Sequence, residues 1–182
     1  MKNPLLIVLT GKTASGKDTI ASKLPNFKRV ITTTSRSPRR SEINGKDYLF
    51  LTKQEFENKI KQGEFFEYVT YGGNLYGTFK KELEQSGDLL WRIDPSRAGQ
   101  IKNVLQDALV IYITCDDEVI LQRLKKRGLK DTEIQKRMSD DTKIWQQYKD
   151  KYDFVIENVP GKLDDTISKV CQIIISNYIQ DL

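Results

Sequence analysis

The chain has 182 residues, with 30 Lys and Arg, 25 Asp and Glu and no histidine, which gives a formal net charge of +5. Without histidine, a Ser-His-Asp triad, a Cys-His dyad and a zinc site with histidine ligands are excluded. The two cysteines are too few for a thiolate zinc site. Any catalysis must therefore use carboxylates, lysine, arginine, tyrosine, hydroxyls, backbone amides or a hard metal ion.

The length suits a single domain over residues 1–182, and 38% hydrophobic residues are enough for a core. Cys115 and Cys171 lie in apolar segments, which predicts two buried free thiols in an intracellular chain. The apolar run 5–9 is too short for a signal peptide or a membrane span, so we expect a cytoplasmic protein without a membrane partner. The positive charge is compatible with nucleic acid or with small polyanions in one cleft, and the sequence carries no signal for the oligomeric state.

Strands and helices alternate along the chain. The run 5–9 predicts a strand buried on both faces, and the helix that follows over 17–24 is expected to stop at Pro25. Further strands are predicted at 29–31, 48–51, 65–71, 89–93, 109–114 and 154–156. Helices are predicted at 53–62, 97–105, 132–149 and 163–179, with another that runs from the acidic pair 116–117 to 127. This order predicts an α/β fold with a mostly parallel central sheet.

A phosphate-binding loop is predicted between the first strand and the first helix. Its residues are Gly11, Lys12, Thr13, Ala14, Ser15, Gly16 and Lys17, followed by Asp18 and Thr19. This is the G-x-x-x-x-G-K pattern in its strand–loop–helix context, where backbone N–H groups and the lysine hold nucleotide phosphates. The sequence therefore predicts ATP binding by residues 11–19, with Mg²⁺ as cofactor.

The residue after the lysine departs from this pattern, which expects a Ser or Thr as the Mg²⁺ ligand. Asp18 stands there instead, and Thr19 follows. A carboxylate is also a hard oxygen ligand, so either Asp18 or Thr19 is the candidate metal ligand.

A second anion site is indicated by the polar stretch 32–48. Arg36 and Arg39 are held close together by a proline-stiffened loop, and Tyr48 follows a glycine turn. Two guanidinium groups and a phenol can hold a phosphate monoester, although these residues alone also fit a solvated basic loop.

Three segments of the chain together resemble the sequence of guanylate kinases. They are Thr-Thr-x-Arg-x-Pro-Arg-x-x-Glu-x-Asn-Gly-x-Asp-Tyr-x-Phe over 33–50, Phe-x-Glu at 65–67 and Asn-x-Tyr-Gly-Thr at 74–78. With the phosphate loop and the later arginines, the resemblance covers nearly the whole chain. It implies a P-loop kinase three-layer fold whose core is formed by about 1–32, 81–122 and 149–182. It also implies an inserted nucleoside-monophosphate lobe at about 33–80 and a helical lid at about 123–148. The implied enzyme transfers the γ-phosphoryl group of ATP to GMP or dGMP.

The resemblance also assigns site residues. The residues implied to bind the GMP phosphate are Arg36, Arg39, Tyr48 and Tyr76. Those implied to surround the base are Thr32, Glu67 and Thr78. Asp94 matches an acidic residue of the family's GMP site. The lid arginines implied to close over ATP are Arg123, Arg127 and Arg137, and the residues expected to be catalytic are Lys17, Arg36, Arg127 and Arg137. A carboxylate such as Glu67 can accept both neighbouring donors of guanine, whereas adenine would present a lone pair to it.

Three alternatives stay open beside this resemblance. Arg92 replaces an aspartate of the family pattern, and Gly-Lys-Asp at 16–18 with Ser-Arg-Ala at 96–98 resembles ribose 1,5-bisphosphate phosphokinases, which share the fold. Those kinases lack the Arg-x-Pro-Arg pattern. A non-catalytic guanylate-kinase-like binding module is disfavoured by the intact phosphate loop. A nucleic-acid binder is disfavoured because no base-stacking or groove-reading motif is evident, so we expect no nucleic-acid partner.

Overall fold

A five-stranded parallel sheet forms the centre of the molecule. The computed structural model describes residues 4–24 and 26–180. The strands are β1 (Leu6–Gly11), β2 (Lys28–Val30), β7 (Leu89–Arg92), β8 (Leu109–Thr114) and β9 (Phe154–Glu157), in the order β2-β7-β1-β8-β9. Every neighbouring pair is parallel, which confirms the predicted α/β fold.

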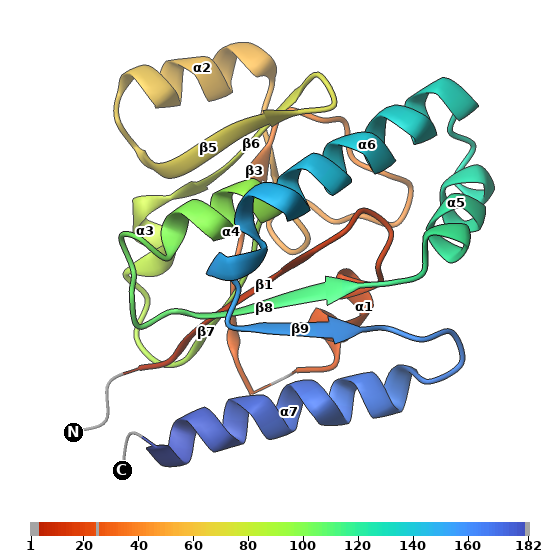
Figure 1. Cartoon of the computed structure of the whole chain (residues 1–182). Helices are drawn as coiled ribbons and strands as arrows, with labels where there is room; N and C mark the ends of the chain where they lie inside the picture. The colour runs from red at the N-terminus through yellow and green to blue at the C-terminus, as the bar shows by residue number, and fades with distance from the viewer. Residues whose placement is uncertain (1–3, 25, 181–182) are drawn as a thin grey trace.

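Helices cover both faces of this sheet and make three layers (Figure 1). One face carries α1 (Lys17–Ser22) and α7 (Leu163–Gln180), and the other carries α4 (Pro95–Ile101) and α6 (Asp131–Tyr148). α5 (Asp117–Lys126) precedes α6 and packs against it. In the part of the chain that the structure describes, no helix is long and apolar enough to cross a membrane.

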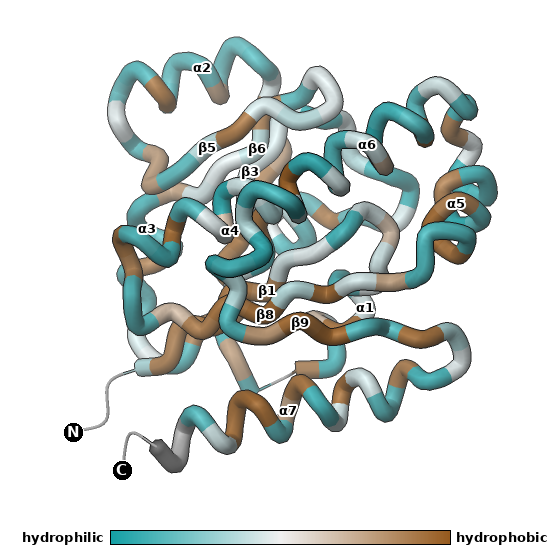
Figure 2. The backbone as a smooth tube through the Cα atoms, viewed as in Figure 1, coloured by the Kyte–Doolittle hydropathy of each residue, from teal (hydrophilic) through white to brown (hydrophobic). Residues whose placement is uncertain are grey.

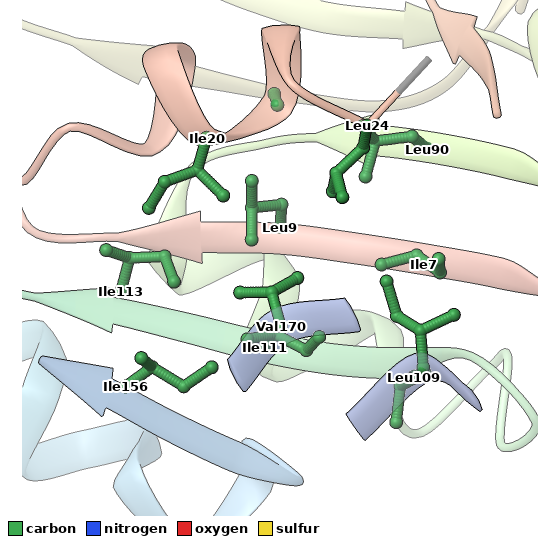
Figure 3. Packing of buried hydrophobic residues seen from close by; sticks show 12 residues of the cluster. Ile7, Leu9, Ile20, Leu24, Leu90, Leu109, Ile111, Ile113, Ile156 and Val170 are labelled. Carbon is green, nitrogen blue, oxygen red and sulfur yellow. The ribbon is translucent and has the colours of Figure 1, made fainter. Parts of the chain in front are cut away.

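The core follows from the two-residue period of the strands. Ile7 and Leu9 pack toward α1 and α7, whereas Val8 between them packs toward α4 and α6. Figure 3 shows the first of these clusters, in which Ile20 and Val170 come from the helices. Figure 2 shows apolar colour along β1, β8 and β9, and of these strands β1 and β8 are buried on both faces, whereas Phe154 and Val155 of the edge strand β9 are exposed.

A second, smaller sheet lies beside the first. Its strands are β3 (Thr33–Thr34), β4 (Leu49–Phe50), β5 (Phe65–Tyr71) and β6 (Asn74–Phe79), in the order β4-β3-β6-β5. α2 (Lys53–Lys61) covers it, and Phe56, Phe65 and Phe79 stack with ring centroids 4.3 and 4.4 Å apart. Thr52 and Glu55 form a capping box that begins α2 at the predicted place.

Several predictions differ in detail from the structure. The helix expected at 97–105 begins earlier, at Pro95, because Asp94 caps it by accepting from the Ser96 N–H. The strands β3 and β6 and the short helices α3 (Lys80–Leu83) and η1 (Lys149–Lys151) were not predicted. Cys115 is buried as expected, but Cys171 on α7 is partly exposed, so the prediction of two buried thiols is wrong for Cys171. The expected stop at Pro25 lies outside the described residues.

Candidate active site

One cavity joins the carboxyl ends of the central strands to the second sheet. It measures about 1090 Å³, including space open to solvent. The predicted site residues that line it are Gly11, Thr13, Ala14, Gly16, Lys17, Asp18, Thr19, Thr32, Arg39, Tyr48, Glu67, Tyr76, Asp94, Arg127 and Arg137. The predicted site residues outside this lining are Lys12, Ser15, Arg36, Thr78 and Arg123. Tyr71, Arg92 and Asp141 also line the cavity and were not predicted as site residues.

The phosphate loop requires its glycines. Gly11 and Gly16 have φ of +148° and +94°. A Cβ on Gly11 would lie 2.0 Å from the carbonyl oxygen of Ile113, and one on Gly16 would lie 2.4 Å from Nδ2 of Asn158. Ala14 adopts a positive φ of +55° although it carries a side chain. Such backbone strain is maintained only by surrounding contacts and often occurs at functional sites.

Two distant side chains supply such contacts to the loop. Asn158, which follows β9, donates from Nδ2 to the carbonyl of Ser15 at 2.8 Å and accepts from the hydroxyl of Thr166 on α7 at 3.3 Å. Arg123 donates from Nη1 to the carbonyl of Ala14 at 2.8 Å. Arg123, a predicted ATP contact, therefore lies against the backbone of the loop.

The Lys17 ammonium lies inside the loop. It donates to the carbonyls of Gly11 and Lys12 at 3.3 and 3.2 Å. Burial lowers the pKa of Lys17, because desolvation disfavours the charged form, while the charges of Asp18 and Asp141 oppose this effect. A bound phosphate would compensate for the same desolvation.

Asp141 on α6 binds the other side of the loop. Its Oδ2 accepts the backbone N–H of Thr13 at 2.7 Å. Burial raises the pKa of Asp141 to about 6, although this hydrogen bond favours the ionised form. α6 therefore contacts the phosphate loop directly, through a residue for which the sequence carried no local signal.

The two arginines of the 32–48 loop have different environments. Arg36 donates from Nη2 to both carboxylate oxygens of Glu42 at 2.9 Å, and from Nη1 to the carbonyl of Ser37 at 2.6 Å. Burial by itself lowers the pKa of Arg36, but Glu42 raises it overall. Arg39 reaches the cavity, and its Nη1 lies 3.8 Å from Glu42 Oε1. Of the two arginines predicted to bind the GMP phosphate, only Arg39 lines the cavity in this structure.

Glu67 is buried at the far end of the cavity and only 4% exposed. Its Oε1 accepts from the Thr78 hydroxyl at 2.7 Å, and that hydroxyl accepts from the indole N–H of Trp91 at 2.9 Å. Nε of Arg97 lies 3.4 Å from Glu67 Oε2. Burial raises the pKa of Glu67 to about 7, although Thr78 and Arg97 lower it. Thr78, which is expected beside the base, contacts the base-reading candidate Glu67 and lies outside the cavity lining.

Arg92 and Asp18 form an ion pair across the cavity wall, with Nη1 and Oδ1 2.7 Å apart. Cζ of Arg92 lies 4.8 Å from the centre of the Tyr48 ring. Partial desolvation at the cavity wall opposes ionisation of Asp18, but the positive charges of Arg92 and Lys17 lower its pKa overall. Both residues depart from the patterns that the sequence otherwise follows, and the structure brings them into contact.

Two further arginines reach the cavity from the helices α5 and α6. Arg127 immediately follows α5, and burial together with the charge of Arg39 lowers its pKa. Arg137 lies on α6, 3.2 Å from Glu133, with Cζ 5.8 Å from the centre of the Tyr71 ring. The cavity therefore has cations on several sides, which suits a ligand with several phosphate groups.

The oxygen donors at the cavity fit a nucleotide-bound Mg²⁺ ion. Mg²⁺ keeps several waters and is usually bound by one or two carboxylates together with substrate phosphates. Asp18 is 57% exposed at the cavity, and Thr19 lies beside it. Among residues 4–24 and 26–180, no group of three or more acidic or cysteine side chains is placed to hold a metal. The donor set suits an ion that arrives with phosphates and does not suit an all-protein cage.

Comparisons with known proteins agree with this geometry. The guanylate kinase family profile matches residues 3–177. The chain is 35% identical to the guanylate kinase of Clostridium tetani over 96% of this chain and 86% of the relative. It is 36% identical to that of Fusobacterium nucleatum subsp. nucleatum over 94% of each chain.

Solved structures show the same fold. The crystal structure of guanylate kinase from Anaplasma phagocytophilum has a TM-score of 0.77 at 24% identity and covers 96% of this chain and 86% of its own. Shikimate kinase from Acinetobacter baumannii has a TM-score of 0.54 at 20% identity, with 96% and 95% covered.

The family match covers nearly the whole chain, and the named relatives exceed 30% identity over most of both sequences. They do not favour the sugar-phosphate kinase or the non-catalytic module. The chain therefore belongs to the guanylate kinase family of enzymes.

Proposed function

We propose that this enzyme transfers the γ-phosphoryl group of ATP to GMP, or to dGMP, and forms ADP and GDP or dGDP. The observation that carries the proposal is the continuous cavity from Lys17 in the phosphate loop to the buried carboxylate Glu67. A donor nucleotide held by residues 11–19 and a purine next to Glu67 would direct their phosphates toward each other. Segment 33–80 then serves as the acceptor lobe, and segment 123–148 serves as the lid.

Positioning and charge account for the chemistry. Lys17 and the loop amides hold the donor phosphates, while Arg39, Tyr48 and Tyr76 hold the acceptor phosphate. Arg36 joins them if GMP displaces one of its contacts with Glu42. The acceptor oxygen belongs to a phosphate that is largely ionised near neutral pH, so no strong base is needed.

Charge on the transferring group is neutralised from two sides. Arg127 and Arg137 approach it from α5 and α6, and Mg²⁺, with Asp18 or Thr19 as its protein ligand, neutralises phosphate charge when bound. Closure of segment 123–148 excludes water, which would otherwise accept the phosphoryl group.

Glu67 accounts for the choice of base. Its carboxylate accepts N1–H and the 2-amino group of guanine at once, while Thr32 and Asp94 line the same cavity. Adenine would present a lone pair at N1 to this buried acceptor. Sites built on such hydrogen bonds discriminate by about 10⁴–10⁵.

An acceptor panel tests the reaction. ADP release is measured with Mg²⁺-ATP and GMP, dGMP, AMP, CMP, UMP or ribose 1,5-bisphosphate. We expect turnover with GMP and dGMP and none above background with the other acceptors. Turnover confined to the sugar bisphosphate would replace the proposal with the sugar-phosphate kinase.

The Lys17→Ala variant tests the donor site. Because one positioned cation is removed from the transferring group, kcat should fall by about 10²–10³ while GMP affinity stays unchanged. Lys23→Ala, at an exposed position just after α1, is the control and should keep normal turnover. Near-normal kcat in Lys17→Ala would contradict the role given to Lys17.

A further inference from the structure

Arg92 lies at the functional end of the central sheet. It is the last residue of β7, which pairs with β1 on one side and β2 on the other. Ligands of parallel sheets bind outside the carboxyl ends of the strands. β1 continues into the phosphate loop, so Arg92 stands next to the loop and inside the same cavity.

The guanidinium is buried but has few partners. The Arg92 side chain is 11% exposed. Nη1 lies 2.7 Å from Asp18, and Nη2 lies 3.4 Å from the carbonyl oxygen of Asp47. These contacts use two of the five N–H donors of a guanidinium. A desolvated arginine is costly unless its donors are satisfied, so the remaining donors suit an anion in the cavity.

The neighbours of Arg92 belong to the proposed acceptor site. Its guanidinium lies over the ring of Tyr48, and Tyr48 contacts Tyr76 edge to face with ring centroids 6.3 Å apart. Arg36, in contrast, is bound to Glu42 and does not line the cavity. Arg92 therefore places a cation at the acceptor end where Arg36 is already paired.

We propose that Arg92 binds the phosphate of the acceptor nucleotide and that Asp18, through its ion pair, is the positioning residue that fixes the guanidinium. This inference rests on the proposed function and adds a phosphate ligand to it. Asp18 is largely exposed and contacts Arg92 through Oδ1, so it can hold Arg92 and stay accessible to solvent. The aspartate in the phosphate loop and the arginine at the end of β7 then act as one unit.

The test compares GMP with guanosine, which lacks the phosphate, by calorimetry without ATP or metal. Charge-assisted hydrogen bonds contribute roughly 1.5–3 kcal/mol, so Arg92→Met should raise the Kd of GMP about 10- to 100-fold. The Kd of guanosine should not change. Arg92→Lys keeps the charge without the planar fork and should fall between wild type and Arg92→Met.

Arg40→Met is the matched control. Arg40 is exposed, lies outside the cavity and carries the same charge, so this variant should bind GMP like the wild type. Unchanged GMP affinity in Arg92→Met, or an equal loss for GMP and guanosine, would overturn the role of Arg92. Absence of GMP turnover by the wild-type enzyme would instead overturn the proposed function.

The part played by Asp18 is tested in two backgrounds. Asp18→Ala should raise the Kd of GMP several-fold in the wild-type chain, because Arg92 loses its anchor. It should cause no such rise in the Arg92→Met background. A rise of equal size in both backgrounds, or in neither, would overturn the positioning role.

Discussion

In the proposed function, the single buried side chain of Glu67 sets both the base preference and the pH dependence of binding. Its neighbours are the Thr78 hydroxyl on β6, the Arg97 guanidinium on α4 and the negative charge of Asp94. Thr78 and Arg97 favour the ionised carboxylate, while burial and Asp94 favour the neutral acid and raise its pKa to about 7. Only the ionised form accepts both donors of guanine, so the residue works near its titration point.

Guanosine affinity should therefore fall as the pH falls through 7. Below the pKa, each pH unit should weaken binding about tenfold, because the ionised fraction falls by that factor. Guanosine is the probe because the phosphate of GMP titrates in the same range. The measurement is the Kd of guanosine between pH 6 and pH 8 by calorimetry.

Glu67→Gln is the control for this titration. Its amide cannot ionise, so guanosine should bind weakly with a nearly flat pH profile, while ATP binding should stay normal. A flat profile in the wild type, or equal loss of both ligands in the variant, would contradict the role of Glu67.

At the residue scale, arrangements of residues that are close together in the sequence could be predicted, and contacts between residues far apart in the sequence could not. The phosphate loop was predicted because its residues are consecutive and their spacing carries the chemistry. Arg92 attracted attention as an unusual residue, but its contact with Asp18 joins residues far apart in the chain. Asp141 lies 128 residues from its partner Thr13 and had no local signal. Such contacts arise only when the strands and helices are assembled.

At the scale of elements, the strands that are mainly apolar were predicted, and two strands rich in polar residues or glycine were not. β8 matches the predicted 109–114, because five of its six residues are buried and apolar. β3 has only two threonines, and in β6 the apolar alternation of Leu75 and Phe79 is interrupted by Gly77. Their pairing with each other and with β4 and β5 makes them strands.

The contact between α4 and α6 depends on a glycine. Gly99 on α4 faces Tyr148 at the end of α6, and a Cβ there would lie 2.4 Å from Cδ1 of the ring. Alanine would improve helix propensity by about 1 kcal/mol. Overpacking of this kind costs about 1–3 kcal/mol, so the clash should prevail.

Gly99→Ala should therefore lower the free energy of unfolding by up to about 2 kcal/mol in urea titrations. In a Tyr148→Ala background the ring atoms are absent and only the Cβ contact at 2.7 Å remains, so the same substitution should cost less than in the wild type. A stabilising effect in the wild-type background would show that the two helices do not meet as closely as described.

At the scale of the whole molecule, the cavity lies where the central sheet, the smaller sheet and the helix α6 meet. The central sheet supplies the phosphate loop, the smaller sheet supplies Tyr76 and Glu67, and α6 supplies Arg137. Its lining contains Lys17, Arg39, Arg92, Arg127 and Arg137 against Asp18, Glu67, Asp94 and Asp141. The five cations and four carboxylates leave the lining only one positive charge in excess, so most of the net charge of +5 lies elsewhere on the chain.

Ligands that contact both sheets and α6 in this cavity should stabilise the entire fold. At 100 times its Kd a ligand adds about 2.7 kcal/mol, which for this size corresponds to a rise in Tm of roughly 5–10 °C. GMP and a non-hydrolysable ATP analogue should each raise Tm, and both together should raise it further. Thermal melts with AMP at the same concentration are the comparison. An equal rise with AMP would contradict guanine recognition.

The hydrogen bonds that join Asn158 to Ser15 and Thr166 affect the order in which parts of the protein can fold during synthesis. Ser15 is made early, but its hydrogen-bond partner is 143 residues further along the chain. A ribosome must therefore synthesise residue 158 and the start of α7 before the nascent loop can acquire these supports. The nucleotide-binding element that is translated first is thus completed among the last, and a nascent chain that lacks β9 and α7 would not yet hold ATP in the manner of the finished enzyme.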